Sequence, residues 1–375
     1  MPGRHRLACA LALAAALLAG CSEDPEAAPE PEPTEATSEQ ESPTPSDSPE
    51  ATPTKKPRKP SPPPADEPRI ELLDWKPVPG PVDDEVTVSG KWRLTRTADG
   101  SRARLSGPAG ATYRPPAGFT YSDVLIDGQY AVVVAQHQQE TKPSVAEVVD
   151  LSNGGVTRID GTSKPATTSG GAWAIGSGFL VHATLRGSDY CLAEVDLLAG
   201  RGRLGPCVPP RHGINNVTIT PAGTSAMTFD DSRPSCRTLA RVQGTRFVPL
   251  SGVGRCTGWD VATTETAAVW SEIPDERRIE EAEFFADTGS GPVELGTGTS
   301  GTLTWCGDAA YFVRDPQRRD DPARLVRVRD GEATVVYESP GTGKAFLSTP
   351  RCGGADLTLS AYSSAGDEQV TARVG

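Results

Sequence analysis

The chain has 375 residues, and its 49 acidic and 37 basic side chains give it a formal net charge of −12. This acidic balance argues against nucleic acid as the main partner and favours solubility rather than any particular ligand. Three histidines lie beyond the N-terminal segment, His137, His182 and His212, with no HxxH or CxxC spacing. No Gly-x-Ser-x-Gly elbow, Walker loop or His-Glu-x-x-His occurs, so we expect no metal, no cofactor and no catalytic residue.

The N-terminus begins with Arg4 and Arg6, which precede an apolar run that ends at Leu18. A positive segment, a short apolar core and small residues before a cleavage point are typical of a secretory signal peptide. The run is too short for a stable membrane span. The stretch Leu18-Ala19-Gly20-Cys21 resembles the lipobox of bacterial lipoproteins. That resemblance implies a signal peptide over residues 1–20, an acylated Cys21, and anchoring in the cell membrane on its extracytoplasmic face.

Residues 21–69 read as a linker, because Pro, Glu, Ser and Thr dominate from Ser22 to about Pro68. Such a composition cannot offset the entropy of ordering, and its prolines favour an extended, semi-rigid spacer. A short basic block, from Lys55 to Lys59, is interpreted as part of this solvated linker rather than as a nucleic-acid site. The Ser-Pro and Thr-Pro pairs leave open whether the linker carries O-linked sugars.

Residues 70–375 read as all-β, with a self-similar unit of strand, tight turn and strand. The turns recur every 42 to 50 residues, a period near that of propeller blades. Each unit is followed by a second hairpin, as at Asn153-Gly154 and Asp330-Gly331, so two hairpins make one four-stranded blade. The turn positions of the six units are Gly128, Gly178, Gly223, Glu265, Asp308 and Gly354.

The two ends of the domain complement each other. The last repeat, Phe346 to Val374, ends before its fourth strand, while Trp92–Arg96 and Arg102–Leu105 look like the second half of a blade. We therefore predict six blades, with an N-terminal strand closing the last one and removing two unpaired edges. The alternative is seven blades, if Glu85–Ser89 begins a blade of its own.

One turn carries a family resemblance. Thr220-Pro221-Ala222-Gly223 resembles the Ser-Pro-Asp-Gly turn of TolB-like β-propellers, which share the WD40-like architecture. The resemblance implies the architecture and no partner.

The cysteines fit an oxidising compartment. Cys9 leaves with the signal peptide and Cys21 takes lipid, so an even set of six is left to form disulfides. In two successive repeats, one cysteine opens the third strand and another follows the fourth, which places them close enough to bridge. The third pair occupies equivalent turns of neighbouring blades and follows by elimination. The predicted bridges are Cys191–Cys207, Cys236–Cys256 and Cys306–Cys352.

Three long, charged loops are the candidate binding elements. They link second and third strands at Gln136–Ser144, Ile273–Ile279 and Arg314–Arg324, on the face that also carries the blade-to-blade links. The alternative is that these loops are solvated caps. Trp173, Trp259 and Trp305 fall on first strands near the centre of the ring, either to stack a sugar or peptide or to fill the core. The candidate binding residues are Arg277, Arg278, Arg318 and Arg319.

Two classes of function stay open. The first is a lipid-anchored, monomeric binding propeller that engages a protein or cell-envelope polymer in a scaffold or sensing role. The second is an extracytoplasmic hydrolase or lyase acting on an envelope polysaccharide or peptide. Acid pairs such as Asp83-Asp84 are interpreted as solvated turn formers. A deep central pocket with convergent carboxylates would favour the enzyme.

Overall fold

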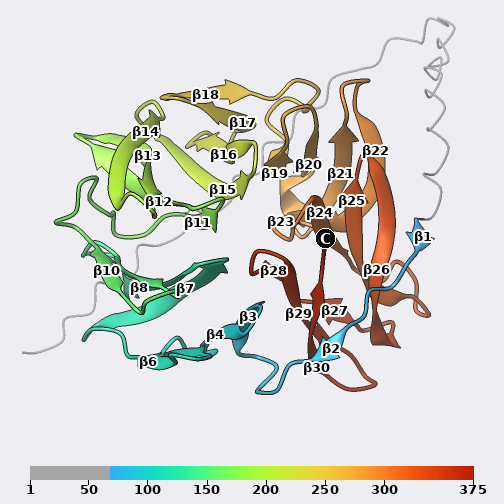
Figure 1. Ribbon diagram of the computed structural model, residues 1–375. Coiled ribbons are helices and arrows are strands. Elements are labelled where there is room, and N and C mark those ends of the chain that lie inside the picture. The colour runs from blue at the N-terminus through green and yellow to red at the C-terminus, as the bar shows by residue number, and fades with distance from the viewer. Residues whose placement is uncertain (1–67) are drawn as a thin grey trace, which may run out of the picture. The chain divides into compact units, whose positions relative to one another are not determined.

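The computed structural model describes residues 68–375, which form a ring of seven radially arranged β-sheets (Figure 1). The predicted signal peptide of residues 1–20, the predicted lipid site at Cys21 and the linker up to residue 67 lie outside the described residues. Within residues 68–375, none of the helices has the length and apolar character needed to cross a membrane. The fold class, an all-β propeller, is confirmed.

Blades 1 to 6 each contain four successive strands that pair antiparallel, in order from the centre of the ring outwards. Blade 1 consists of β3 (Glu85–Ser89), β4 (Trp92–Arg96), β5 (Ala103–Ser106) and β6 (Ala111–Tyr113), and blade 2 of β7 (Phe119–Asp127), β8 (Tyr130–His137), β9 (Val145–Asp150) and β10 (Val156–Ile159). Blade 3 consists of β11 (Trp173–Gly176), β12 (Phe179–Arg186), β13 (Asp189–Asp196) and β14 (Arg201–Cys207), and blade 4 of β15 (His212–Thr220), β16 (Gly223–Asp230), β17 (Arg237–Gln243) and β18 (Arg246–Pro249).

The last three blades complete the ring, and two of them include short strands from the start of the domain. They are β19 (Gly258–Thr263), β20 (Ala268–Glu272), β21 (Glu281–Asp287) and β22 (Val293–Thr299), with the 3-10 turn η1 (Glu276–Arg278) before β21; β23 (Thr304–Cys306), β24 (Ala309–Arg314), β25 (Pro322–Arg329) and β26 (Glu332–Thr342), with β1 (Arg69–Ile70) beside β26; and β27 (Phe346–Leu347), β28 (Arg351–Cys352), β29 (Asp356–Tyr362) and β30 (Glu368–Arg373), with β2 (Lys76–Pro77) beside β30.

The prediction of six blades is wrong, and the alternative of seven is right. Glu85–Ser89 is the innermost strand of a complete first blade, and Trp92–Arg96 is its second strand rather than part of the last blade. Its turn at Gly90 (φ 56°) is equivalent to the six turns found in the sequence. The blade escapes detection because its strands have only three to five residues, which shortens the repeat.

An N-terminal strand does complete the last blade, but it lies earlier in the chain than predicted. β2 pairs antiparallel with β30, with Lys76 opposite Thr371. Just upstream, β1 pairs parallel with β26. Between them, the Trp75 ring lies 5.2 Å from the ring of Tyr337, and its Nε1–H donates to Val336 O at 2.8 Å. Residues 69–77 therefore form a strap across the outer edges of blades 6 and 7.

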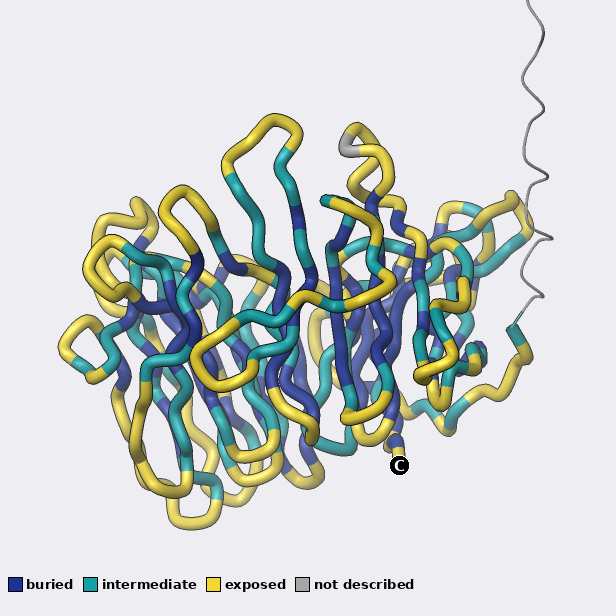
Figure 2. The backbone as a smooth tube through the Cα atoms, turned by 90° about the horizontal axis from the view of Figure 1, so that it is seen from above, coloured by how far each residue is buried: buried dark blue, intermediate teal, exposed yellow. Residues whose placement is uncertain are grey.

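The hydrophobic core lies between the blades, so both faces of most sheets are buried. On β8, Ala131 and Val133 pack towards blade 1, while Val132 and Val134 pack towards Leu180 of blade 3. This arrangement explains why the strand reads as a continuous apolar run rather than an alternating one. Figure 2 shows buried strand segments through the middle of the ring and exposed loops projecting from it.

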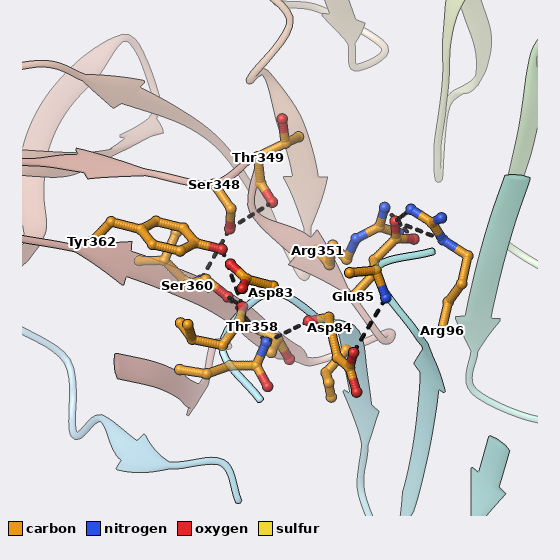
Figure 3. A pocket seen from close by; sticks show the side chains of 15 residues that line it. Asp83, Asp84, Glu85, Arg96, Ser348, Thr349, Arg351, Thr358, Ser360 and Tyr362 are labelled. Atoms are coloured by element: carbon orange, nitrogen blue, oxygen red, sulfur yellow. Dashed lines mark hydrogen bonds and ion pairs between the residues drawn. The ribbon is translucent and has the colours of Figure 1, made fainter. Parts of the chain in front are cut away.

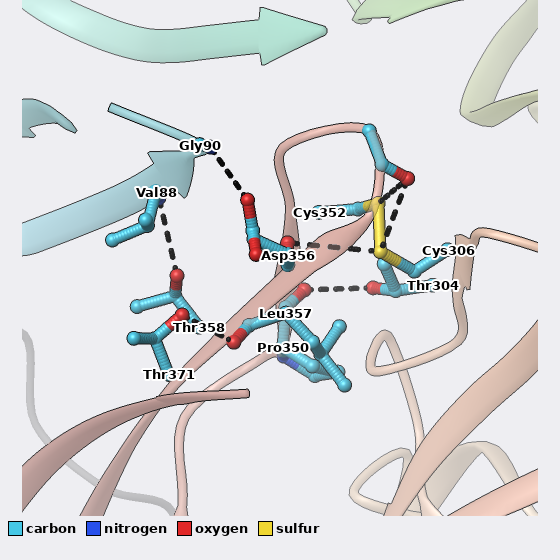
Figure 4. Close-up of a disulfide and its surroundings, with 11 residues drawn as sticks. Val88, Gly90, Thr304, Cys306, Pro350, Cys352, Asp356, Leu357, Thr358 and Thr371 are labelled. Atoms are coloured by element: carbon cyan, nitrogen blue, oxygen red, sulfur yellow. Dashed lines mark hydrogen bonds between the residues drawn. A yellow bond between two sulfur atoms is a disulfide. The ribbon is translucent and has the colours of Figure 1, made fainter. Parts of the chain in front are cut away.

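All three predicted disulfides are present. Cys191–Cys207 joins the third strand of blade 3 to the end of its fourth. In blade 4, Cys236 directly precedes the third strand, and its partner Cys256 lies in the link between β18 and β19. Cys306 and Cys352 bridge the inner strands of blades 6 and 7, and their Cα atoms are 5.4 Å apart (Figure 4). Beside that bridge, Gly90 N donates to Asp356 Oδ2 at 2.6 Å, so blade 7 is tied to blade 6 by a covalent bond and to blade 1 by hydrogen bonds.

Candidate functional site

The three predicted loops project from one face of the ring, because each joins the second strand of its blade to the third. They connect β8 to β9, β20 to β21 and β24 to β25. Arg277 and Arg278 lie in the η1 turn, where the Asp275 side chain accepts a hydrogen bond from Arg277 N at 3.0 Å. Arg278 is ion-paired with Glu281. All four candidate arginines, Arg277, Arg278, Arg318 and Arg319, are exposed, on blades 5 and 6.

A cavity of about 300 Å³ lies between blades 7 and 1 on this same face (Figure 3). Its position follows from its walls, because residues 82–84 are the link from blade 7 to blade 1 and Ala98 lies between β4 and β5. We call it the 7/1 cleft. The pair Asp83-Asp84, predicted to be a solvated turn, lines it. Asp84 Oδ1 accepts from Ala98 N at 3.2 Å, whereas Asp83 is exposed.

The inner end of the 7/1 cleft is a charged cluster that the sequence did not reveal. Glu85, whose side chain is 13% exposed, is ion-paired with both Arg96 and Arg351. Arg96 Nε lies 3.1 Å from Glu85 Oε2, and Arg351 Nη1 donates to Val124 O of blade 2 at 3.3 Å. Burial lowers the pKa of Arg351, and the Glu85 and Asp123 carboxylates partly oppose that shift. The cluster therefore fixes a guanidinium where blades 7, 1 and 2 meet.

The centre of the ring is a channel of about 290 Å³, and Arg351 lines both this channel and the 7/1 cleft. Inner strands of blades 1, 2, 3, 4, 6 and 7 form its wall. Among the described residues that line it, Asp123 alone carries a carboxyl group. Burial raises the pKa of Asp123, with Arg351 and Arg96 acting in the opposite direction. The channel thus has the central position expected of an enzyme site. The described residues of its wall do not supply the convergent carboxylates that such a site would need.

The three predicted tryptophans have different surroundings. Trp173 and Trp305 line the channel. Trp259 packs in the core beside blades 5 and 6, with the Arg237 guanidinium 5.3 Å from its ring centroid. All three pack against the hydrophobic core, and Trp173 and Trp305 also form part of the channel wall.

A buried carboxyl, Asp260 of β19, joins blades 4 and 5 to the link that leads to blade 6. It accepts from Gly301 N at 2.8 Å, from Ser271 Oγ at 2.9 Å and from Asn216 Nδ2 at 3.2 Å. Burial raises its pKa to about 6, against the effect of the donors from Gly301 and Ser271. Because its oxygens are occupied by protein donors, Asp260 is a structural residue. Within residues 68–375, no three His, Cys, Asp or Glu side chains lie close enough together to hold a metal ion.

No protein-family model and no curated protein matches this sequence. Among solved structures, one neighbour comes from a structural and mechanistic study of two prolyl endopeptidases, with a TM-score of 0.52 and 14% identity. The match covers 81% of this chain and 47% of that chain, so this chain spans about half of that endopeptidase.

A second neighbour is the β-propeller domain of the Trilobed protease from Pyrococcus furiosus, with a TM-score of 0.53 and 10% identity over 77% of this chain and 95% of that one. That domain has an open velcro topology, whereas here β2 completes the last blade. At such low identities the likeness extends to the fold, and the TolB-like resemblance stays a prediction. The comparisons and the sheet order agree on the architecture: this chain folds as a β-propeller.

Proposed function

We propose that this chain is a membrane-anchored, extracytoplasmic lipoprotein whose propeller binds a protein or cell-envelope polymer through its loop-bearing face. The observation that carries the proposal is the 7/1 cleft of about 300 Å³, which opens on the face that carries the three long charged loops. Loops held by a rigid scaffold are the usual place for ligand contacts. A binding role of this kind suits a scaffold or a sensor.

The rim of the 7/1 cleft has the composition of a recognition surface. Phe346 is 53% exposed and stacks on Tyr362, with 4.6 Å between the ring centroids. Tyr362 lines the cleft together with the exposed carboxylate of Asp83 and the hydroxyl group of Ser348. Exposed aromatic side chains next to charged groups are enriched where proteins bind partners. The aromatic pair provides contact area for a partner, and the charged loops attract the partner electrostatically as it approaches.

The second candidate is a hydrolase or lyase acting on an envelope polysaccharide or peptide. It rests on the likeness to an endopeptidase and to the propeller domain of a protease. Acid-base cleavage of a glycosidic bond uses two carboxyl groups at a set separation. In the described part of the channel wall only Asp123 supplies one, so we favour the binding function.

Replacing Arg277, Arg278, Arg318 and Arg319 together with Ser lowers recovery of the partner about tenfold in a pull-down from native envelope, because charges at an interface rim mainly speed encounter. Recovery by the unmodified protein also falls as salt is added. The matched control replaces Lys91, Arg201, Arg246 and Arg329, which lie at turns of the opposite face, with Ser. Equal recovery by both variants, together with a hydrolytic activity that is lost on replacing Asp123, would support the enzyme instead.

Replacing Cys21 with Ser abolishes incorporation of labelled palmitate and moves the protein from the membrane fraction to the soluble fraction. The physical reason is that acyl chains contribute about 0.8 kcal/mol per buried CH₂ and durable anchoring needs more than one chain. The control is Cys9→Ser, which changes a cysteine inside the predicted signal peptide and leaves labelling intact. Membrane retention of unlabelled Cys21→Ser protein would contradict lipid anchoring.

A further inference from the structure

Among the described residues, the outer strands of blades 1 to 5 have no further strand beside them. These strands are β6, β10, β14, β18 and β22. In blades 6 and 7 the chain closes the outer edge itself, because β1 pairs with β26 and β2 pairs with β30. An open edge is a row of unpaired N–H and C=O groups. Native proteins protect such edges with prolines, bulges, charges or very short strands.

Four of the five open edges carry such protection, and the edge of β10 is the exception. β6 has three residues and is followed closely by two prolines. β14 contains a proline, and β18 ends in one. The register between β21 and β22 shifts, as at a bulge. β10 has no proline and pairs with β9 without a shift, and three of its four residues are β-branched. Its one charged residue is Arg158, so β10 is the least protected edge.

Two residues of β10 direct their backbone groups away from the blade. Asp150 N donates to Gly155 O at 2.8 Å, which makes Gly155 a hydrogen-bonded position opposite β9. Hydrogen-bonded and non-hydrogen-bonded positions alternate along an antiparallel pair, so the N–H and C=O groups of Val156 and Arg158 point outwards. No described residue forms a hydrogen bond with these four groups. Val156 is 57% exposed, so the edge is open to solvent.

A groove of about 460 Å³ lies beside this edge, between blades 2 and 3. We call it the 2/3 groove. Thr157 and Ile159 of β10 line it, together with Pro165 and Leu197. The register with β9 places Thr157 and Ile159 on the face of blade 2 that packs towards Leu180 of blade 3. Side chains of a strand added to β10 on this face would therefore enter a partly apolar groove.

The available charge at the 2/3 groove is positive. Lys164 lines the groove, is exposed and forms no ion pair with another described residue. Arg158 lines it as well; its Nε donates to Asp160 Oδ2 at 2.8 Å, and 57% of its side chain is exposed. Among the described lining residues, the one carboxyl group belongs to Asp150, which accepts hydrogen bonds from Ser152 N and Oγ in its own turn. A ligand that complements this groove is acidic.

We propose that the edge of β10 binds an acidic, extended peptide segment of a partner protein, which adds a fifth strand to blade 2. Its backbone pairs with the N–H and C=O groups of Val156 and Arg158. Apolar side chains at every second position pack on Pro165 and Leu197, and carboxylates lie near Arg158 and Lys164. Strand addition is a recurring mode of peptide recognition, and β1 already adds a fifth strand to blade 6.

This site is separate from the loop-bearing face and goes beyond the proposed function. The β9–β10 and β13–β14 turns contribute residues to the wall of the 2/3 groove, and these turns lie on the face opposite the three long loops. Blade 2 could therefore hold a peptide while the loop-bearing face holds another partner.

The test is calorimetric titration of the full chain with a capped hexapeptide of alternating Val and Glu. We expect saturable binding, and about tenfold weaker binding of the matching peptide of alternating Val and Lys, because its charges oppose those of the groove. Hydrogen exchange then slows at the amides of Val156 and Arg158 when the Val-Glu peptide is bound. These two amides report strand addition directly, since they have no partner in the free protein.

Val156→Pro removes one outward N–H and spares the pairing with β9, because proline is tolerated at the first residue of an edge strand. It weakens binding of the Val-Glu peptide about five- to tenfold, the equivalent of one hydrogen bond. The matched control, Val156→Thr, keeps the N–H and binds as the unmodified protein does. Lys164→Glu weakens binding about three- to fivefold, whereas Lys91→Glu, the same charge change at an exposed turn of blade 1, leaves it intact.

Absence of saturable binding up to ~1 mM Val-Glu peptide would overturn the proposal. Unchanged binding by both Val156→Pro and Lys164→Glu would overturn it, and so would unchanged exchange at the amides of Val156 and Arg158. Should Val156→Pro fail to fold, the exchange measurement on the unmodified protein decides. A dimer in sedimentation that Val156→Pro converts to a monomer would assign the edge to a second copy of the chain instead. Recovery of a partner by the loop-bearing face does not depend on any of these outcomes.

Discussion

Replacing Cys306 and Cys352 together with Ala lowers the free energy of unfolding by about 4 kcal/mol. The bridge spans 46 residues of sequence, and in the chain-entropy model a longer closed loop removes more freedom from the unfolded chain. It also joins the inner strands of blades 6 and 7, the neighbours over which the strap lies. Guanidinium unfolding curves of the oxidised proteins measure the difference.

The control is the double replacement of Cys191 and Cys207 with Ala. That bridge spans 16 residues and lies within blade 3, so the same model gives it about 3 kcal/mol. Addition of a reductant that opens all three bridges lowers the stability of the unmodified protein below that of either variant. A Cys306/Cys352 variant that unfolds at the same denaturant concentration as the unmodified protein would contradict a stabilising bridge between blades.

Trp75→Ala lowers the free energy of unfolding by about 2–4 kcal/mol, the combined loss of apolar burial, one aromatic pair and one hydrogen bond. Its ring packs on Tyr337, and its Nε1–H donates to Val336 O. Tyr337 in turn donates through its hydroxyl group to Glu368 Oε1 of blade 7 at 2.6 Å. The change therefore loosens the strap where it crosses from blade 6 to blade 7, and thermal unfolding shows the loss.

Leu72→Ala is the matched control, because Leu72 lies in the same strap and is 57% exposed. An exposed apolar side chain contributes little to stability. The free energy of unfolding of this variant therefore stays within about 0.5 kcal/mol of that of the unmodified protein. Equal losses for Trp75→Ala and Leu72→Ala would mean that the strap acts through its backbone pairing alone. An unchanged melting temperature for Trp75→Ala would show that this side chain does not stabilise the closed ring.

Much of the blade pattern is local, which is why the sequence predicts it. Innermost hairpins need tight turns, and residues such as Gly128 and Gly178 mark them at a regular interval. Cysteine positions within a blade follow from the same register. The first blade is predicted only as the alternative, because its short strands break the interval. The closing strand is harder to predict, because β2 has only two residues and one of them is proline.

The sites are less predictable because they depend on closure of the ring. Glu85 and Arg351 are ion-paired although almost the whole domain lies between them in sequence. No local sequence spacing connects two such residues. Their ion pair can be predicted only when the number of blades is known, because that number decides which strands become neighbours when the ring closes. The long loops are different, since their length and charge are visible in the sequence and their face follows from strand order. The central tryptophans were placed near the axis, but their exposure to the channel depends on packing.

The strap also has a consequence for the order in which the protein is made. Residues 69–77 leave the ribosome early, yet their partners, Val335 and Thr371 among them, are made last. Closing so large a loop is slow in comparison with forming hairpins within a blade. Hairpins within a blade close short loops, so they form before the early segment meets its edge. The final step of folding is therefore the meeting of the two ends of the domain, and any chain cut short before β30 ends as an open arc.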